Sequence, residues 1–256
     1  MNFQRGVLPV YWSKQHGAYI TLIICWMIGL FLSPAYSLLQ PVVLIFLLSG
    51  FNLIELVLEK YKRKTPLPHG RKIWLLIYTF ITILFGFFTL LKVPLLRYLL
   101  PVFVCSGLIF ILLALKRKQK SVFAEWLTFA VFSLSGILAY SPGKIPDLSW
   151  ILRLTLLMSL YFGLSIFLVK FWLGKLMSYG GLIYVISAVL FMFFFYSESR
   201  IIYAVGILMF LKSLIPIVAG PWYKNLPIKR IGMLEAMFHL IFLLILVLIF
   251  PNTSEF

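Results

Sequence analysis

The sequence predicts an all-α, polytopic membrane protein built as one bundle of nine transmembrane helices. Hydrophobic residues make up 62% of its 256 positions and the mean hydropathy is +1.05, whereas charged residues make up only 12%. Soluble globular proteins carry about twice that charged share. The apolar residues form long runs, which is typical of membrane helices, and they do not alternate with polar residues as in membrane β-strands. A water-soluble domain is therefore excluded.

Nine apolar runs are long enough to cross a bilayer, which takes about 20 helical residues. The predicted spans are residues 17–33, 41–58, 73–92, 97–115, 122–140, 150–171, 180–196, 201–219 and 233–250. Their connections are short, so residues 1–256 are expected to form a single transmembrane domain. Cys25 and Cys105 lie inside such runs and are expected to be packing residues, not a disulfide or a metal site.

The positive charge predicts the topology of the chain. The net charge of +16 comes from 23 Lys and Arg residues against 7 Asp and Glu. If the N-terminus is cytoplasmic, only five of these cations fall on the outer side: Lys92, Arg97, Lys144, Arg153 and Arg200. The positive-inside rule then supports nine spans with the N-terminus in the cytoplasm and the C-terminus outside. The inner (cytoplasmic) membrane is the expected location of this multi-pass protein. Because topology and attraction for anionic lipid explain the basic charge, nucleic acid is not an expected partner.

The second predicted span carries a set of oxygen-bearing side chains. Asn52, Glu55 and Glu59 are spaced i, i+3 and i+7, so they fall within roughly 60° of arc on one face of a helix. Carboxylates inside a membrane helix are costly and usually have a partner or a function. Cations follow at once in residues 60–64, and then a Pro-Leu-Pro-His-Gly turn at 66–70. Oxygen ligands beside Lys and Arg are what a magnesium-bound diphosphate requires.

This stretch resembles the first signature of the UbiA superfamily of membrane prenyltransferases, with Asn52 in place of the first aspartate. Two other segments, residues 13–19 and 229–235, resemble the YwiC-like family more closely than they resemble other members of that superfamily. The YwiC-like family itself resembles a distant branch of the UbiA superfamily. The resemblance implies nine transmembrane helices around a central cavity open to the cytoplasm. It also implies that the acidic helix holds magnesium bridged to an isoprenoid diphosphate, while basic loop residues hold the phosphates. Two loops rich in Pro and cations, residues 60–72 and 220–231, are either a lid over this cavity or interfacial anchors.

The resemblance and the residue types together give a candidate site. The expected metal ligands are Asn52, Glu55 and Glu59. The expected substrate-binding residues, which are basic and near the cytoplasmic face, are Lys14, His16, Lys62, Arg63, Lys170 and Lys175. No catalytic residue is assigned.

The second acidic motif of a catalytic prenyltransferase is missing. The corresponding segment, residues 160–175, contains no carboxylate, so at most one magnesium ion is expected. Either Lys170 and Lys175 replace the second metal, or the fold has been kept without the transferase reaction. A magnesium-dependent prenyltransferase therefore remains one hypothesis for the function. The alternatives are a non-catalytic lipid-binding or assembly protein and, ranked last, a small transporter.

Two further acidic positions have simpler explanations. Glu235 and His239 lie at i and i+4 on one face of the last span, where a mutual hydrogen bond is preferred over a proton relay or a metal clip. Glu125 opens the fifth span, where a negative charge suits a helix N-terminus.

Overall fold

The computed structural model describes residues 16–62, 66–118, 120–140, 146–196 and 200–249, and this part of the chain contains helices and no strand. The helices are α1 (His16–Leu32), α2 (Leu39–Lys62), α3 (His69–Lys92), α4 (Pro94–Leu115), α5 (Val122–Tyr140), α6 (Leu148–Trp172), α7 (Gly180–Tyr196), α8 (Arg200–Val218), α9 (Gly220–Asn225) and α10 (Ile228–Ile249). Each predicted span falls on one of them, while the short α9 lies in a segment predicted to be a polar loop.

Seven of the described helices are long and apolar enough to cross a membrane: α2, α3, α4, α5, α6, α8 and α10. The apolar helices α1 and α7 have 17 residues each and fall short of that length. The structure thus supports a multi-pass helical membrane protein with seven candidate spans. Nine spans stay a prediction.

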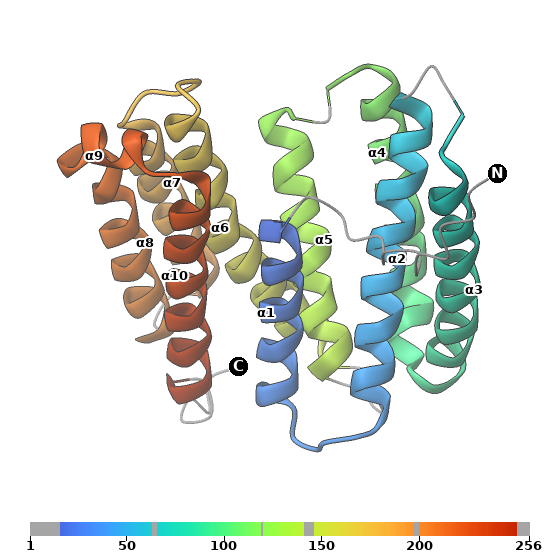
Figure 1. Cartoon of the computed structure of the whole chain (residues 1–256). Helices are drawn as coiled ribbons and strands as arrows, with labels where there is room; N and C mark the ends of the chain where they lie inside the picture. The colour runs from blue at the N-terminus through green and yellow to red at the C-terminus, as the bar shows by residue number, and fades with distance from the viewer. Residues whose placement is uncertain (1–15, 63–65, 119, 141–145, 197–199, 250–256) are drawn as a thin grey trace.

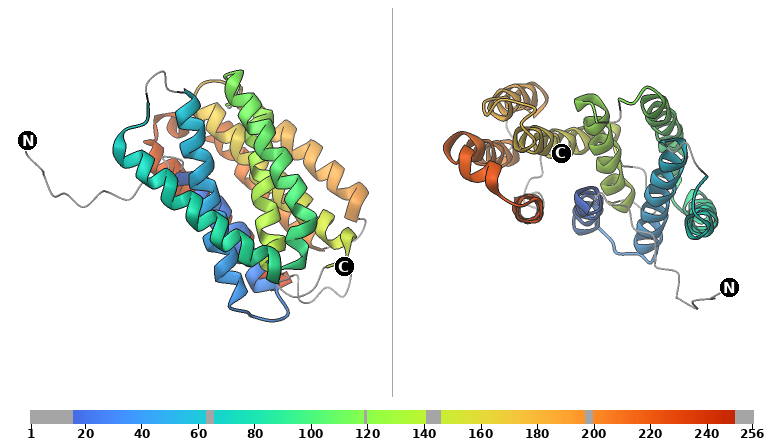
Figure 2. Two further views of the ribbon diagram at one scale, coloured as in Figure 1. Left: turned by 90° about the vertical axis from the view of Figure 1, so that its right-hand side faces the viewer. Right: turned by 45° about the horizontal axis from the view of Figure 1, so that its top comes forward.

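The helices form two neighbouring groups, α1–α5 and α6–α10 (Figure 1). α5 packs against α6 and α1 packs against α10, so these contacts join the groups. Figure 2 shows the same arrangement from two further directions. α6 is the most enclosed of the seven candidate spans, with 72% of its apolar window buried, whereas α3 has 11% buried. Side chains on α6 therefore meet other side chains of the protein on most sides.

Two glycines allow α1 and α5 to approach closely. A Cβ atom placed on Gly29 of α1 would lie 1.8 Å from the carbonyl oxygen of Gly136, and one on Gly136 of α5 would lie 2.5 Å from that of Cys25. The obstructing atoms belong to backbone, which cannot move aside as a flexible side chain can. Small residues at such crossings let membrane helices pack backbone to backbone.

One end of the bundle collects exposed cations, and we call it the basic end. It contains the ends of α2, α4, α6 and α8 and the starts of α3, α5, α7 and α10 (Figure 1). Its exposed cations are Lys60, Lys72, Lys116, Arg117, Lys118, Lys120, Lys175, Lys224, Lys229 and Arg230. The opposite end includes Asp147, which caps α6 by accepting a 3.0 Å hydrogen bond from the Ser149 backbone N–H. The charge asymmetry of the sequence thus corresponds to two physical ends of the fold.

Candidate functional site

The polar face of α2 packs against α1 and α3. Asn52 is only 2% exposed, and its Oδ1 accepts a hydrogen bond from the Tyr19 hydroxyl of α1. Its Nδ2 donates a 2.9 Å hydrogen bond to the Leu48 carbonyl one turn earlier. Three residues before Asn52, Ser49 accepts a 3.1 Å hydrogen bond from Thr82 of α3. The first predicted metal ligand is therefore engaged by a neighbouring helix through the oxygen that a metal ion would use.

The two carboxylates of α2 lie nearer the basic end and are partly exposed. Glu59 forms an ion pair with Arg71, in the first turn of α3. Glu55, one turn deeper, also has a partly exposed side chain. The turn at 66–70 thus brings the start of α3 back beside the acidic end of α2. We call Glu55, Glu59 and Arg71 the α2–α3 corner.

Arg71 lies in the stretch 60–72, which the sequence predicts to be a basic loop that serves as a lid or as an interfacial anchor. Arg71 and Glu59 belong to different helices, so helical spacing gives no sign of their pairing. The pair forms because the predicted turn at 66–70 carries the start of α3 back beside α2, and only the tertiary structure shows that Arg71 is the cation that meets Glu59.

Several predicted phosphate ligands lie where the structure gives no side-chain geometry. Lys14 and Arg63 lie outside the described residues. His16 begins α1 and Lys62 ends α2, but the positions of their side chains are not described. Lys175 is exposed in the connection between α6 and α7. The roles of these residues in binding stay predictions.

Lys170, the remaining predicted phosphate ligand, ties α6 to α5. Its side chain is 9% exposed and its Nζ lies 3.1 Å from Oε2 of Glu125, in the first turn of α5. The same ammonium donates a 2.8 Å hydrogen bond to the Lys120 carbonyl. Glu125 therefore does more than complement a helix N-terminus, since it balances a nearly buried cation on the next helix.

A second polar group lies inside the other half of the molecule. We call it the buried polar cluster: Ser165 of α6, Lys212 of α8, and Glu235 and His239 of α10. The Lys212 ammonium is fully buried, 2.6 Å from Oε2 of Glu235 and 2.9 Å from Oγ of Ser165. Ser165 donates a 2.6 Å hydrogen bond to the same carboxylate oxygen. Three helices are thus linked through one oxygen atom.

The histidine of this cluster, His239, makes its contacts through Nε2. That nitrogen lies 3.4 Å from Oγ of Ser165 and 3.6 Å from Oε2 of Glu235. The His239 ring also meets the ring of Phe162 edge-on, with centroids 4.8 Å apart. Its Nδ1 is buried and has no hydrogen-bond partner in the described part of the chain. The predicted Glu235–His239 pairing is thus a loose contact within a larger network.

Sequence reasoning missed Lys212 and Ser165. A signal was present, because Lys212 is a lone cation inside an otherwise apolar span, and such residues usually mark a functional or paired position. Which acid it meets depends on how α8 packs against α10.

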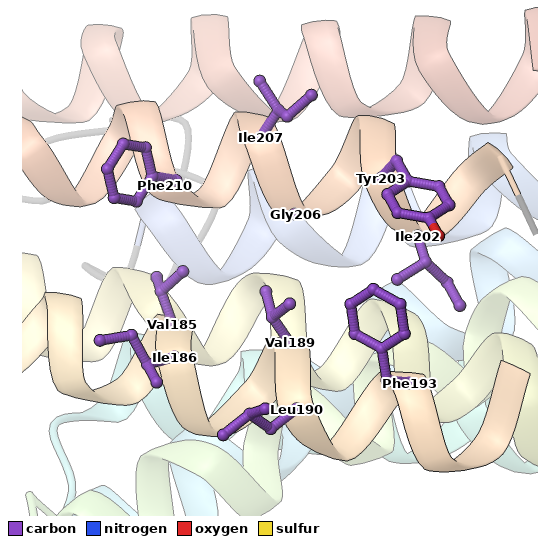
Figure 3. Close-up of a pocket in the computed structure, with 10 residues that line it drawn as sticks. All are labelled: Val185, Ile186, Val189, Leu190, Phe193, Ile202, Tyr203, Gly206, Ile207 and Phe210. Carbon is purple, nitrogen blue, oxygen red and sulfur yellow. The ribbon is translucent and has the colours of Figure 1, made fainter. Parts of the chain in front are cut away.

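The described residues also form an apolar groove of about 360 Å³ between α7 and α8. Figure 3 shows Ile186, Leu190 and Phe193 of α7 across from Ile207 and Phe210 of α8. The groove lies in the α6–α10 group, away from the α2–α3 corner. A central cavity beside Glu55 and Glu59, open to the cytoplasm, stays a prediction.

A model of the YwiC-like protein family matches residues 12–140 of the chain. The chain belongs to the YwiC-like family. The matched segment includes α1–α5, so it contains the α2–α3 corner but not the buried polar cluster of this YwiC-like protein. No curated protein and no solved structure matches the chain.

The donor set at the α2–α3 corner is compatible with one magnesium ion. Among the described residues, no three His, Cys, Asp or Glu side chains gather closely enough to hold a metal alone. Magnesium is commonly bound by one or two carboxylates, with phosphate oxygens and water completing its octahedral shell. Glu55 and Glu59 therefore suit an ion that arrives with a phosphorylated ligand, and Asn52 would have to share its oxygen with Tyr19.

Proposed function

We propose that this YwiC-like membrane protein binds the diphosphate group of an isoprenoid or similar lipid at its basic end. The observation that carries the proposal is the α2–α3 corner, where Glu59 and Arg71 from two helices meet one turn from the partly exposed Glu55. A carboxylate pair can hold a cation, and a guanidinium can hold phosphate oxygens in a bidentate manner. Both kinds of group are needed by a metal-bound diphosphate.

The remaining parts of the proposed site come from the sequence. Glu55, Glu59 and Asn52 hold a single magnesium ion, which neutralises the diphosphate charge when bound. Lys14, His16, Lys62 and Arg63 complete the phosphate shell, with Lys170 and Lys175 on the α6 side. Exposed cations at the same end draw an anionic headgroup toward the site.

The proposal includes an orientation. The basic end faces the cytoplasm, the N-terminus is cytoplasmic and the C-terminus lies outside the inner membrane, as the positive-inside rule requires. A prenyl diphosphate made in the cytoplasm would then reach the α2–α3 corner without crossing the bilayer.

Prenyl transfer is a further step of the same proposal, in the manner of the UbiA superfamily. It requires charge at the second metal position, and the segment 160–175 offers only Lys170 and Lys175. Lys170 is already paired with Glu125. A lysine supplies one positive charge where magnesium supplies two, so we expect slow transfer at most.

A non-catalytic lipid-binding or assembly protein is the second candidate. The observations in its favour are the Tyr19–Asn52 hydrogen bond and the Lys170–Glu125 ion pair, which give two predicted ligands a packing role. This candidate predicts that the polar groups of α2 stabilise the bundle whether or not a ligand is present.

Thermal unfolding of the purified full-length protein tests the proposal. Farnesyl and geranylgeranyl diphosphate are added with and without magnesium, beside farnesol and inorganic diphosphate as half-ligands. A ligand at 100 times its Kd stabilises by about 2.7 kcal/mol, which raises the Tm of a chain of this size by roughly 5–10 °C. We expect that rise only with the whole ligand and magnesium together.

Two variants and one matched control make the test specific. Glu55→Gln and Glu59→Gln should abolish the magnesium-dependent rise. Asp147→Asn removes an exposed carboxylate at the opposite end of the bundle, keeps a side chain that can cap α6, and should leave the rise in place. If Glu59→Gln responds to the lipid diphosphates as the unchanged protein does, the α2–α3 corner is not the binding site.

A further inference from the structure

The apolar groove between α7 and α8 has a buried floor and exposed walls. Buried residues of both helices line its floor, among them Val185, Ile202 and Gly206. Its walls consist of exposed side chains on both sides (Figure 3): Ile186, Leu190 and Phe193 of α7, and Tyr203, Ile207 and Phe210 of α8. Because these walls lie on the outside of an apolar bundle, the groove opens toward the lipid of the membrane.

Gly206 gives the groove its depth. A Cβ atom placed on this residue would have one neighbour within 4 Å in the described part of the chain, the Cγ2 atom of Val189 at 3.4 Å. A larger side chain at this position would therefore meet little protein and would extend into the groove. The space above Gly206 is thus available to another molecule.

The length of the groove indicates what kind of molecule fits. From Val185 to Phe193 the helix rises about 12 Å, and the hydrocarbon core of a bilayer is about 30 Å thick, so the groove spans roughly one leaflet. A transmembrane helix of a partner or of a second copy crosses both leaflets, and it packs best where several small residues line the contact. Gly206 is the one small residue among the lining residues. A single hydrocarbon chain, which is narrow and flexible, suits the groove better than a helix does.

A cation lies in line with one end of the groove. Arg200 is exposed and is the first residue of α8, at the end of the bundle opposite the basic end. It precedes Tyr203 by three residues and Ile207 by seven, so all three share one face of the helix. A guanidinium binds phosphate oxygens in a bidentate manner, and tyrosines are common at the depth of lipid headgroups. An apolar groove with a cation at its end complements a molecule that joins a hydrocarbon chain to a phosphate.

We infer that the α7–α8 groove and Arg200 together bind one anionic phospholipid from the leaflet away from the basic end. One acyl chain lies in the groove over Gly206, and the lipid phosphate contacts the Arg200 guanidinium. Tyr203, whose ring meets that of Phe193 edge-on at 5.6 Å, lies between the chain and the headgroup. This site is separate from the proposed diphosphate site, because the groove is in the α6–α10 group and Arg200 is at the other end of the bundle from the α2–α3 corner.

Native mass spectrometry of the purified, delipidated full-length protein tests the inference, because it counts the lipids bound to each chain. Phosphatidylglycerol is titrated beside phosphatidylethanolamine with the same acyl chains and beside glycerol phosphate, which has no chain. Glu198 precedes α8 in the sequence, outside the described residues, so the zwitterionic lipid shows whether the headgroup charge matters. We expect one phosphatidylglycerol to bind in a saturable manner, phosphatidylethanolamine to bind more weakly, and glycerol phosphate not to bind.

Two variants with matched controls locate the bound lipid. Gly206→Leu fills the groove and should abolish saturable binding, whereas Gly107→Leu on α4, whose Cβ would meet no described atom within 4 Å, should not. Arg200→Gln should weaken binding roughly fivefold, the usual effect of one basic residue beside an anionic headgroup. Lys92→Gln removes an exposed cation from the same end of the bundle but from α3, and should leave binding unchanged.

Several results would overturn the inference. The first is that the unchanged protein binds no phosphatidylglycerol in a saturable manner, or binds phosphatidylethanolamine equally well. This result needs no variant, so it decides the matter even if a substitution prevents folding. The second is that Gly206→Leu or Arg200→Gln binds phosphatidylglycerol as the unchanged protein does. The third is a dimer, or a complex with another protein, that Gly206→Leu dissociates, since the groove would then hold a helix.

None of these results bears on diphosphate binding at the α2–α3 corner. That proposal is tested with prenyl diphosphates and magnesium, and with substitutions of Glu55 and Glu59 on another helix. Either proposal can therefore fail without the other.

Discussion

The two halves of this membrane protein differ in how far their ion pairs are exposed. At the α2–α3 corner, Glu59 and Arg71 remain 23% and 31% exposed at the basic end. In the α6–α10 half, Lys212 is fully buried and its carboxylate partner is shared with a serine and a histidine. An exposed pair can exchange its partner for a ligand at little cost, whereas a buried charge depends on its partner.

This difference shows why the acidic residues of the chain cannot be judged by type or by spacing alone. Glu59 on α2 and Glu235 on α10 each lie near the basic end of an apolar helix. The two glutamates differ in the helices around them. α2 packs against α3, which is mostly exposed, whereas α10 packs against both α8 and α1. Substitutions that remove one group from each region should therefore have very different effects on stability.

The largest effect is expected for Lys212→Ala. It leaves the Glu235 carboxylate without its counter-ion inside the bundle, which typically costs about 3–5 kcal/mol. Thermal unfolding in detergent should show a large fall in Tm, with Lys175→Ala, an exposed lysine, as the control near zero. A Lys212→Met, Glu235→Leu double variant should recover much of the loss because it removes both charges. A small effect of Lys212→Ala would mean that the cluster is hydrated.

A smaller loss is expected for Asn52→Ala. The variant removes the Asn52 side chain that accepts a hydrogen bond from the buried Tyr19 hydroxyl, and such a loss costs about 1–3 kcal/mol. Tyr19→Phe removes the donor instead and leaves the buried Oδ1 of Asn52 without this bond, so a loss of similar size is expected, although Nδ2 keeps its hydrogen bond to Leu48. Comparing the two unfolding curves with that of the double variant measures the coupling between α1 and α2. Additive effects would show that the hydrogen bond contributes little.

Ser165→Ala should cost about 1 kcal/mol, within the range for one intramolecular hydrogen bond. It removes the hydroxyl between Lys212 and Glu235 but leaves their direct 2.6 Å contact in place. The variant should therefore stay folded, and its Tm should fall less than that of Lys212→Ala. Ser187→Ala on α7, whose exposed hydroxyl donates to its own helix, is the matched control. Equal losses in Ser165→Ala and Lys212→Ala would contradict the central role of the ion pair.

The smallest effect on stability is expected for Arg71→Gln. Partly exposed ion pairs contribute about 0–1 kcal/mol, so its Tm without ligand should hardly change. Its response to a lipid diphosphate with magnesium should nevertheless weaken, because a phosphate contact is lost. Lys72→Gln, an exposed neighbour on the same turn, provides the comparison. A large loss of stability in Arg71→Gln would mean that the Glu59–Arg71 pair stabilises the fold as the buried Lys212–Glu235 pair does. The proposed difference between the two halves would then be wrong.

The sequence by itself determined that the fold is a bundle of membrane helices and which end of the bundle is basic. Long apolar runs require helices in a membrane, because every backbone polar group must be satisfied within its own segment. The uneven cations identified the basic end, and the spacing of Asn52, Glu55 and Glu59 placed them on one face of α2. Such features depend on local periodicity and composition, which a sequence contains in full.

Only the tertiary structure decided which groups meet. It brought Arg71 to Glu59, Tyr19 to Asn52, and Lys212 to Glu235. Each of these pairs joins different helices. An apolar helix in a membrane carries little information about which neighbour it packs against, since lipid and protein are similarly apolar. The partners of its few polar groups are therefore fixed by the packing of the whole bundle.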